Sequence, residues 1–187
     1  MTRPSVVPTS LLALALLASG CGSHTLQTMD EQVNQAKGQI ETQLQRRADL
    51  VPNLVETVKG VAKQESTIFT SIAESRARLS GAVQSGDIGE MSEANRELTQ
   101  GIGRLLAIVE NYPELRSSAS FLALQDQLEG TENRIAVARQ DYNTAVGNYN
   151  AYIRRFPYNL TAKLFGQGSR EYFEAEPGAE EAPKVQF

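Results

Sequence analysis

The sequence has no tryptophan and holds one cysteine and one histidine in 187 residues. A single cysteine excludes an internal disulfide, and a single histidine excludes most histidine-based metal sites. Aromatic residues make up only 6% of the chain. Few aromatics beside many Ala, Leu, Gln and Glu favour helix over sheet. These scarcities indicate a helical protein without a disulfide framework.

Long runs of basic residues and long runs of apolar residues are also missing. The formal net charge is −4, and the sequence has no block of Lys and Arg. Nucleic acid is therefore not expected as a partner, because nothing would neutralise its phosphates. The apolar run at 11–18 is far shorter than the ~20 residues that span a bilayer.

The cysteine directly follows that short apolar run, in the order Leu17-Ala18-Ser19-Gly20-Cys21. A short positive start, a short apolar run and small residues before a cleavage site are typical of a secretory signal peptide. The order resembles a bacterial lipobox, which predicts cleavage before Cys21 and a covalent diacylglycerol on its thiol. Gly22 is not the Asp that often retains lipoproteins in the inner membrane, so the outer membrane is favoured. Plain secretion with a free cysteine is the alternative.

Helical spacing of apolar residues begins at Leu26 and predicts four long helices, at about 26–48, from 50 to 79 or 83, at 90–111 and at 121–156. Asp49 is the expected N-cap of the second helix, with Pro52 in its first turn, where a missing N–H costs nothing. The alternative is one continuous helix kinked at Pro52. Pro113 and Pro157 end the third and fourth helices.

The helix at 121–156 has the clearest pattern, a bulky residue at every seventh position. These positions are Phe121, Leu128, Ile135, Tyr142, Tyr149 and Phe156. Four long helices with short links predict an all-α fold, an antiparallel up-and-down four-helix bundle. The expected organisation is a signal peptide at 1–20, the lipidated cysteine and a linker at 21–25, the bundle at 26–166 and an acidic flexible tail at 167–187.

Several stretches resemble the LemA family of bacterial membrane-associated helical proteins. They are QLQRRADLVPNLVETVKGVAKQE (43–65), GRLLAIVENYPELR (103–116), FLALQDQLEGTENRIAVARQDYN (121–143), YNAYIRRFPYNLTAKLFG (149–166) and the ending Pro-x-Val-x-Phe. The resemblance implies a helical bundle held at a membrane, without an established activity. The family usually starts with a transmembrane helix, whereas here the cysteine changes the expected anchor from a spanning helix to a lipid.

No set of residues indicates catalysis. His24 lies in the expected linker, and Cys21 has no base partner to activate it as a nucleophile. The sequence lacks a Glu-x-x-His pair, a Gly-x-Ser-x-Gly elbow and a Gly-rich phosphate loop. We expect no enzymatic activity, no metal and no cofactor other than the covalent lipid.

Three features are candidate interaction sites. The first is a polar turn, Arg46, Arg47, Asp49, Pro52 and Asn53. A helix end with a cap, and with arginines at the helix dipole, is the simpler interpretation, and a polar contact site at one end of the bundle is the alternative. The second is the repeat Tyr142-Asn143 and Tyr149-Asn150, which lies on one helix face. Core packing, with each ring inside and its hydroxyl on a polar partner, is the simpler interpretation, and a ligand groove is the alternative.

The third candidate is the ending Val185-Gln186-Phe187. An apolar-x-apolar ending with a free carboxylate is the form that PDZ-type domains capture as an added strand, although a frayed end without a role is the simpler interpretation.

The sequence therefore predicts a non-enzymatic, lipid-anchored structural or adaptor protein of the bacterial envelope, on the extracytoplasmic side. Its expected partners are the membrane and unidentified envelope proteins that bind the tail. The alternative is an envelope sensor that binds a small molecule or peptide in a groove between helices. A hydrolase with an unusual site is the least favoured hypothesis.

Overall fold

The computed structural model describes residues 7–62 and 64–174, with side chains from His24 onward. Within these residues the protein is entirely helical, which confirms the predicted all-α class. The helices are α1 (Val7–Lys59), α2 (Ser66–Ser85), α3 (Ile88–Val109), α4 (Pro113–Arg116), α5 (Ala119–Arg154) and α6 (Tyr158–Leu164).

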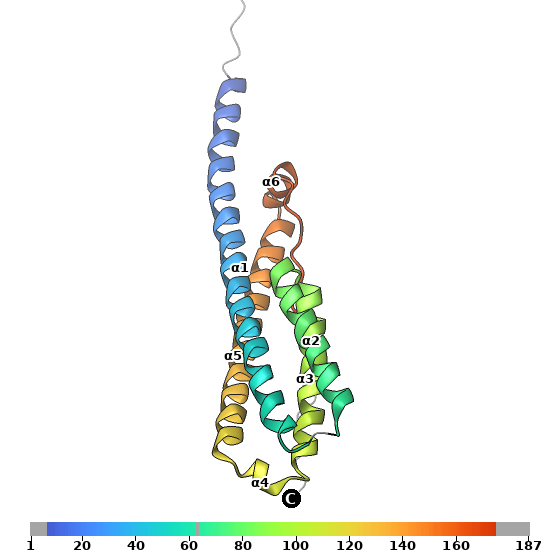
Figure 1. Cartoon of the computed structure of the whole chain (residues 1–187). Helices are drawn as coiled ribbons and strands as arrows, with labels where there is room; N and C mark the ends of the chain where they lie inside the picture. The colour runs from blue at the N-terminus through green and yellow to red at the C-terminus, as the bar shows by residue number, and fades with distance from the viewer. Residues whose placement is uncertain (1–6, 63, 175–187) are drawn as a thin grey trace, which may run out of the picture.

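The four longer helices lie alongside one another and alternate in direction (Figure 1). Helix α1 packs most extensively against α5, and α2 packs against α3 as a hairpin. Helix α1 projects beyond the bundle at its N-terminal end, α6 lies at that same end, and α4 lies at the opposite end (Figure 1). The predicted third and fourth helices correspond to α3 and α5.

The predicted helix break at Asp49 is wrong, because α1 continues through Pro52 to Lys59. The Asp49 carboxylate does not cap a helix; it accepts a hydrogen bond from Gln45 Nε2 over 2.9 Å. The apolar stripe continues across the proline, since Val51 and Leu54 are buried. Packing of that stripe keeps the helix continuous.

The core is one cluster formed by all four longer helices. The seven-residue pattern of α5 is buried as predicted at Phe121, Leu128, Ile135, Tyr142 and Tyr149. The last predicted member, Phe156, is 80% exposed. Helix α5 ends at Arg154, so the side chain at 156 no longer follows the helix face that meets the core.

Helix ends follow local capping rules. Gly86 ends α2 at φ 70°, Asp87 caps α3 by accepting the Glu90 N–H, and Ser118 caps α5 by accepting the Phe121 N–H. Gly166 follows α6 at φ 65°. There the N–H groups of Gly166 and Gln167 donate to the carbonyls of Lys163 and Ala162. This is the Schellman arrangement, which turns the chain back along the bundle.

Candidate interaction surfaces

Residues 167–174 form an extended segment that lies along α5; we call it the docked segment. Two asparagines of α5 hold its backbone. Asn150 accepts from the Arg170 N–H over 2.8 Å and donates to the Arg170 carbonyl over 2.9 Å. Asn143 makes the same pair of bonds with Phe173, both over 2.9 Å. A side-chain amide offers one donor face and one acceptor face, as a peptide does, so each asparagine holds the segment as a neighbouring strand would.

The spacing of the two asparagines matches the segment. Seven residues of helix rise about 10.5 Å, and three residues of extended chain span about 10 Å. Later residues of the segment meet earlier residues of α5, so the segment runs antiparallel to that helix. The asparagine repeat of the sequence is therefore a backbone clamp.

The two tyrosines of the repeat support the same segment. Tyr142 donates its hydroxyl to the Glu171 carbonyl over 2.8 Å, and Tyr149 donates to Gln167 Oε1 over 2.9 Å. Both rings are buried, which confirms the predicted packing with the ring inside and the hydroxyl on a polar partner. Burial raises the pKa of Tyr142 and of Tyr149 above the ordinary value of 10.0.

Side chains of the docked segment also anchor it. Phe173 is 2% exposed and belongs to the core. Arg170 forms an ion pair with Asp30 of α1 over 2.5 Å, and Ser92 of α3 donates to the Glu174 carbonyl over 3.3 Å. The prediction of a flexible tail is therefore wrong over 167–174, because buried contacts and paired hydrogen bonds offset the entropy of ordering. The remaining tail, including Val185 and Phe187, lies outside the described residues.

A sequence signal for this docking was present. Asn143 and Asn150 recur at the heptad interval, and Asn150 is only 4% exposed. A buried asparagine without partners costs about 1–3 kcal/mol. A repeated pair of asparagines on a core-facing stripe therefore predicts polar partners packed against that stripe, and the structure identifies them as residues 167–174.

The polar candidates at 46–53 do not form one site, because one is buried between helices and others are exposed. Arg47 is 5% exposed; it donates to Asn95 Oδ1 of α3 over 2.7 Å and pairs with Glu132 of α5 over 2.6 Å. It cross-links three helices inside the bundle and does not lie at a helix end. Arg46 and Asn53 are exposed, and their role in binding a partner stays a prediction.

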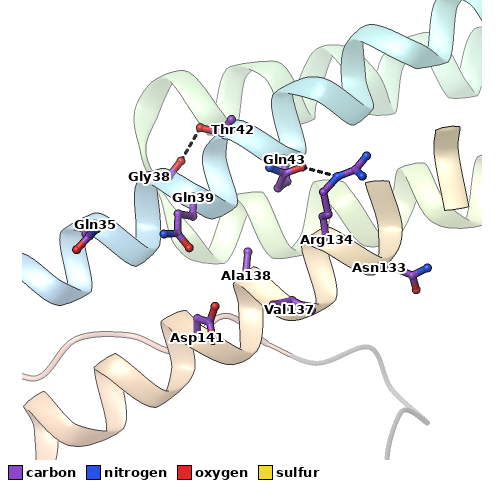
Figure 2. Close-up of a pocket in the computed structure, with 10 residues that line it drawn as sticks. All are labelled: Gln35, Gly38, Gln39, Thr42, Gln43, Asn133, Arg134, Val137, Ala138 and Asp141. Carbon is purple, nitrogen blue, oxygen red and sulfur yellow. Dashed lines mark hydrogen bonds between the residues drawn. The ribbon is translucent and has the colours of Figure 1, made fainter. Parts of the chain in front are cut away.

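A groove of ≈ 640 Å³ lies between α1 and α5 (Figure 2). Arg134 donates to Gln43 Oε1 across it over 3.2 Å. Asp141 and the exposed Val137 line the α5 side, and Gln39 lines the α1 side. The lining offers amide, guanidinium and carboxylate groups around a small apolar surface, which suits hydrogen bonding to a polar ligand or peptide.

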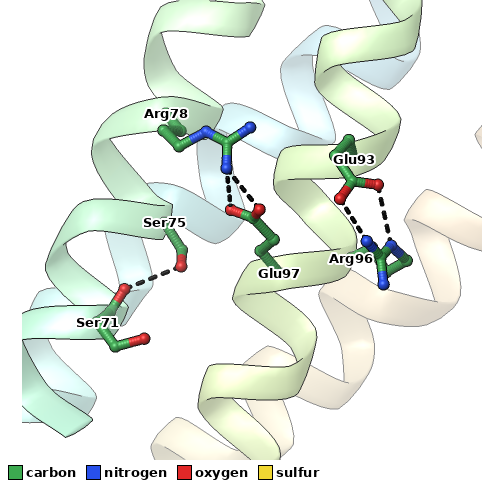
Figure 3. A network of polar contacts seen from close by, with 6 residues as sticks. All are labelled: Ser71, Ser75, Arg78, Glu93, Arg96 and Glu97. Atoms are coloured by element: carbon green, nitrogen blue, oxygen red, sulfur yellow. Dashed lines mark hydrogen bonds and ion pairs between the residues drawn. The ribbon is translucent and has the colours of Figure 1, made fainter.

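A polar seam joins α2 and α3 (Figure 3). Arg78 Nη1 binds both carboxylate oxygens of Glu97 at 2.5 Å. Glu93 binds Arg96 on the same helix, and the hydrogen bond from Arg96 holds the pKa of Glu93 below its ordinary value. Each carboxylate faces an arginine on an exposed surface, so the seam orients the hairpin and contributes little to stability.

Among residues 7–62 and 64–174, no group of three or more His, Cys, Asp or Glu side chains is arranged to hold a metal ion. Over the same residues, no helix combines the length and apolar character needed to cross a membrane. Cys21 falls within α1, and its lipidation stays a prediction.

Fold and surfaces together define an elongated helical-bundle protein that binds part of its own C-terminal chain along one helix. The chain belongs to the LemA family, whose sequence pattern matches residues 36–187.

The chain is similar to three named magnetosome proteins. MamQ 1 and MamQ 2 of Paramagnetospirillum magneticum are each 29% identical to it over 180 residues, which cover 84% of this chain and 66% of theirs. MamQ of Magnetospirillum gryphiswaldense is 28% identical over 176 residues, covering 82% and 65%. The chain thus spans just under two thirds of the length of these relatives.

Proposed function

We propose that this protein is a non-enzymatic, lipid-anchored adaptor of the bacterial envelope. In this proposal Cys21 carries the lipid, the bundle acts as a rigid spacer, and residues 175–187 bind an envelope protein. Membership of the LemA family and similarity to magnetosome proteins support association with a membrane. The extracytoplasmic side follows from the predicted signal peptide, and the outer membrane from Gly22.

The observation that carries the proposal is the direction of the docked segment. Helix α1 projects at the α6 end of the bundle (Figure 1), and the docked segment runs from that end toward the middle of α5. An anchor on α1 and a binding tail would therefore act at different heights above a membrane. The thirteen residues that follow Glu174 reach at most about 45 Å when extended.

Two measurements test the proposal. Mass spectrometry of the membrane-purified protein is expected to give a chain that begins at an acylated Cys21, and C21S is expected to lose membrane flotation. Partner capture from detergent-solubilised membranes then compares the intact chain with one that lacks Val185-Gln186-Phe187. A partner that requires these residues supports the adaptor, whereas identical partners in both samples contradict tail recognition.

The groove between α1 and α5 favours a second candidate function, an envelope sensor for a small polar molecule or peptide. A ligand that binds only the folded state raises the melting temperature by mass action. A ligand screen by thermal shift is expected to give a response that R134A, inside the groove, abolishes and R104A, on α3, preserves. Equal responses of both variants would contradict binding in this groove.

A further inference from the structure

The α6 end of the bundle exposes an apolar surface that the adaptor proposal does not use. It consists of Phe156 (80% exposed), Leu160 (59%), Leu164 (82%) and Phe165 (60%), which we call the α6 cap. These four side chains fall within ten consecutive residues. A concentrated exposed apolar surface on a folded protein is typical of an interaction site.

The charges in the stretch of chain that carries the α6 cap are of one sign, and Asp30 of α1, which lines a pocket with Phe165, is paired with Arg170. From Tyr142 to Arg170 the sequence contains no Asp or Glu and four cations, in a chain whose net charge is −4. Arg170 is paired with Asp30. The other three, Arg154, Arg155 and Lys163, are exposed and form no ion pair with any residue that the structure describes. The partner that fits this surface is apolar and negatively charged.

The cap is also held in a fixed orientation. The rings of Tyr152 on α5 and Tyr158 on α6 stack, with centroids 4.4 Å apart. The Gln167 N–H donates to the Ala162 carbonyl over 2.8 Å at the end of α6. Because α6 is already formed and packed, a surface that binds the cap does not have to order it.

The position of the α6 cap relative to α1 indicates that the partner is a membrane surface. Phe165 lines a small pocket together with Leu26 of α1. Cys21 lies five residues before Leu26 in the same helix, which is about 7.5 Å along the helix axis. A lipid attached at Cys21 would therefore bring the cap to within about two helical turns of the membrane surface.

We propose that the α6 cap and its three flanking cations form a second membrane contact, which docks on anionic phospholipid headgroups beside the lipid anchor. The inference rests on the proposed function for the position of the anchor. Aromatic and aliphatic side chains enter the interfacial layer, and the cations bind the headgroup charges. The two contacts together would hold the bundle in one orientation, whereas a lipid on Cys21 alone would leave it free to tilt relative to the membrane.

Tryptophan fluorescence tests the contact, because the chain has no native tryptophan. L164W places a single reporter in the cap. V61W is the matched control, since Val61 is an exposed apolar residue in the connection after α1. The full chain is reconstituted into phosphatidylcholine vesicles with or without phosphatidylglycerol, and brominated lipid is the quencher. We expect a blue shift and quenching for L164W in the vesicles with phosphatidylglycerol, and neither for V61W.

Charge reversal tests the electrostatic part. R154E/R155E/K163E in the L164W chain is expected to lower the ratio of inserted to free cap by more than roughly a hundredfold. Loss of three cations at about fivefold each accounts for roughly a hundredfold, and the three added carboxylates repel the anionic surface further. If the triple variant loses its helical circular dichroism, R154Q/R155Q is used, with a smaller decrease expected. Equal quenching with and without phosphatidylglycerol would overturn the role of the cations.

Flotation separates this inference from the anchor. An L164W chain that floats with vesicles through Cys21 while its tryptophan stays unquenched overturns the α6 cap contact and leaves the anchor intact. Quenching of the L164W reporter in vesicles with phosphatidylglycerol, together with unchanged flotation of C21S on vesicles of phosphatidylcholine alone, overturns the lipid anchor and supports the cap. A blue shift without quenching shows that protein, for example a second copy, covers the cap, and it overturns the membrane contact.

Discussion

Arg76 of α2 donates its Nε–H to the backbone carbonyl of Ala48 in α1 over 2.8 Å. This carbonyl is four residues before Pro52, so it is the one that the proline leaves without a helical donor. At Pro52, a side chain from the neighbouring helix α2 thus supplies the hydrogen bond that the helix backbone lacks. The continuity of α1 depends on this contact as well as on its apolar stripe.

Replacement of this arginine is expected to cost stability only while the proline is present. R76M leaves the Ala48 carbonyl without its partner and should lower the free energy of unfolding by about 1–3 kcal/mol. In a P52A chain the residue at 52 supplies the N–H, so R76M should cost clearly less. Urea unfolding of the four chains forms a double-mutant cycle. Equal costs in both backgrounds would show that Arg76 acts by packing alone.

Loss of one asparagine clamp is expected to release the docked segment. N150L removes both hydrogen bonds to Arg170 and should raise amide hydrogen exchange across 167–174, with a loss of about 1–3 kcal/mol. N148L is the matched control, because Asn148 is exposed on the same helix. Unchanged exchange in N150L would mean that Phe173 and the Asp30–Arg170 ion pair suffice to hold the segment.

Two glycines of α3 are expected to respond in opposite directions. A Cβ at Gly101 would lie 3.0 Å from Cγ1 of Ile72, whereas a Cβ at Gly103 would have no neighbour within 4 Å. G101L should therefore force α2 and α3 apart and cost about 1–3 kcal/mol. G103A should stabilise by about 0.5–1 kcal/mol through helix propensity. Thermal unfolding measures both; equal melting temperatures would contradict the close approach at Ile72.

Alkaline pH is expected to weaken the bundle through its two buried tyrosines. The pKa of Tyr142 and of Tyr149 is raised by burial above 10.0. The unfolded chain releases these protons near that pH, while the folded chain retains them. The unfolded state then binds fewer protons, so the free energy of unfolding falls as the pH rises from about 10 through the raised pKa values.

Y142F/Y149F is expected to reduce this pH dependence, because it removes both titrating groups. Urea unfolding between about pH 9 and about pH 11 compares the two chains. In a titration followed by phenolate absorbance, the variant should lack the two tyrosine ionisations that occur at the highest pH. Stability profiles of equal slope would assign the alkaline loss to other groups.

Much of the helical architecture was predictable because its signals are local. The heptad from Phe121 to Tyr149, the caps at Asp87 and Ser118, and Gly86 between α2 and α3 act within a few residues of chain. The Tyr-Asn repeat was recognised as a face of α5, and the burial of its rings followed from that face.

The errors arose where a distant residue satisfied a local requirement. Pro52 indicated a helix end, since the donor that compensates for it, Arg76, comes from another helix. The docked segment has the low hydrophobicity of a disordered tail, and its order comes from the asparagines of α5.

The sequence by itself determined that the chain is helical, where α3 and α5 lie and which residues of α5 face the core, because propensity and periodicity depend on neighbours along the chain. Only the tertiary structure decided that α1 continues through its proline, that residues 167–174 are docked and that Phe156 joins an exposed α6 cap. Each of these depends on which backbone groups and side chains of different segments come within contact distance. The spacing of residues along one helix does not predict such contacts.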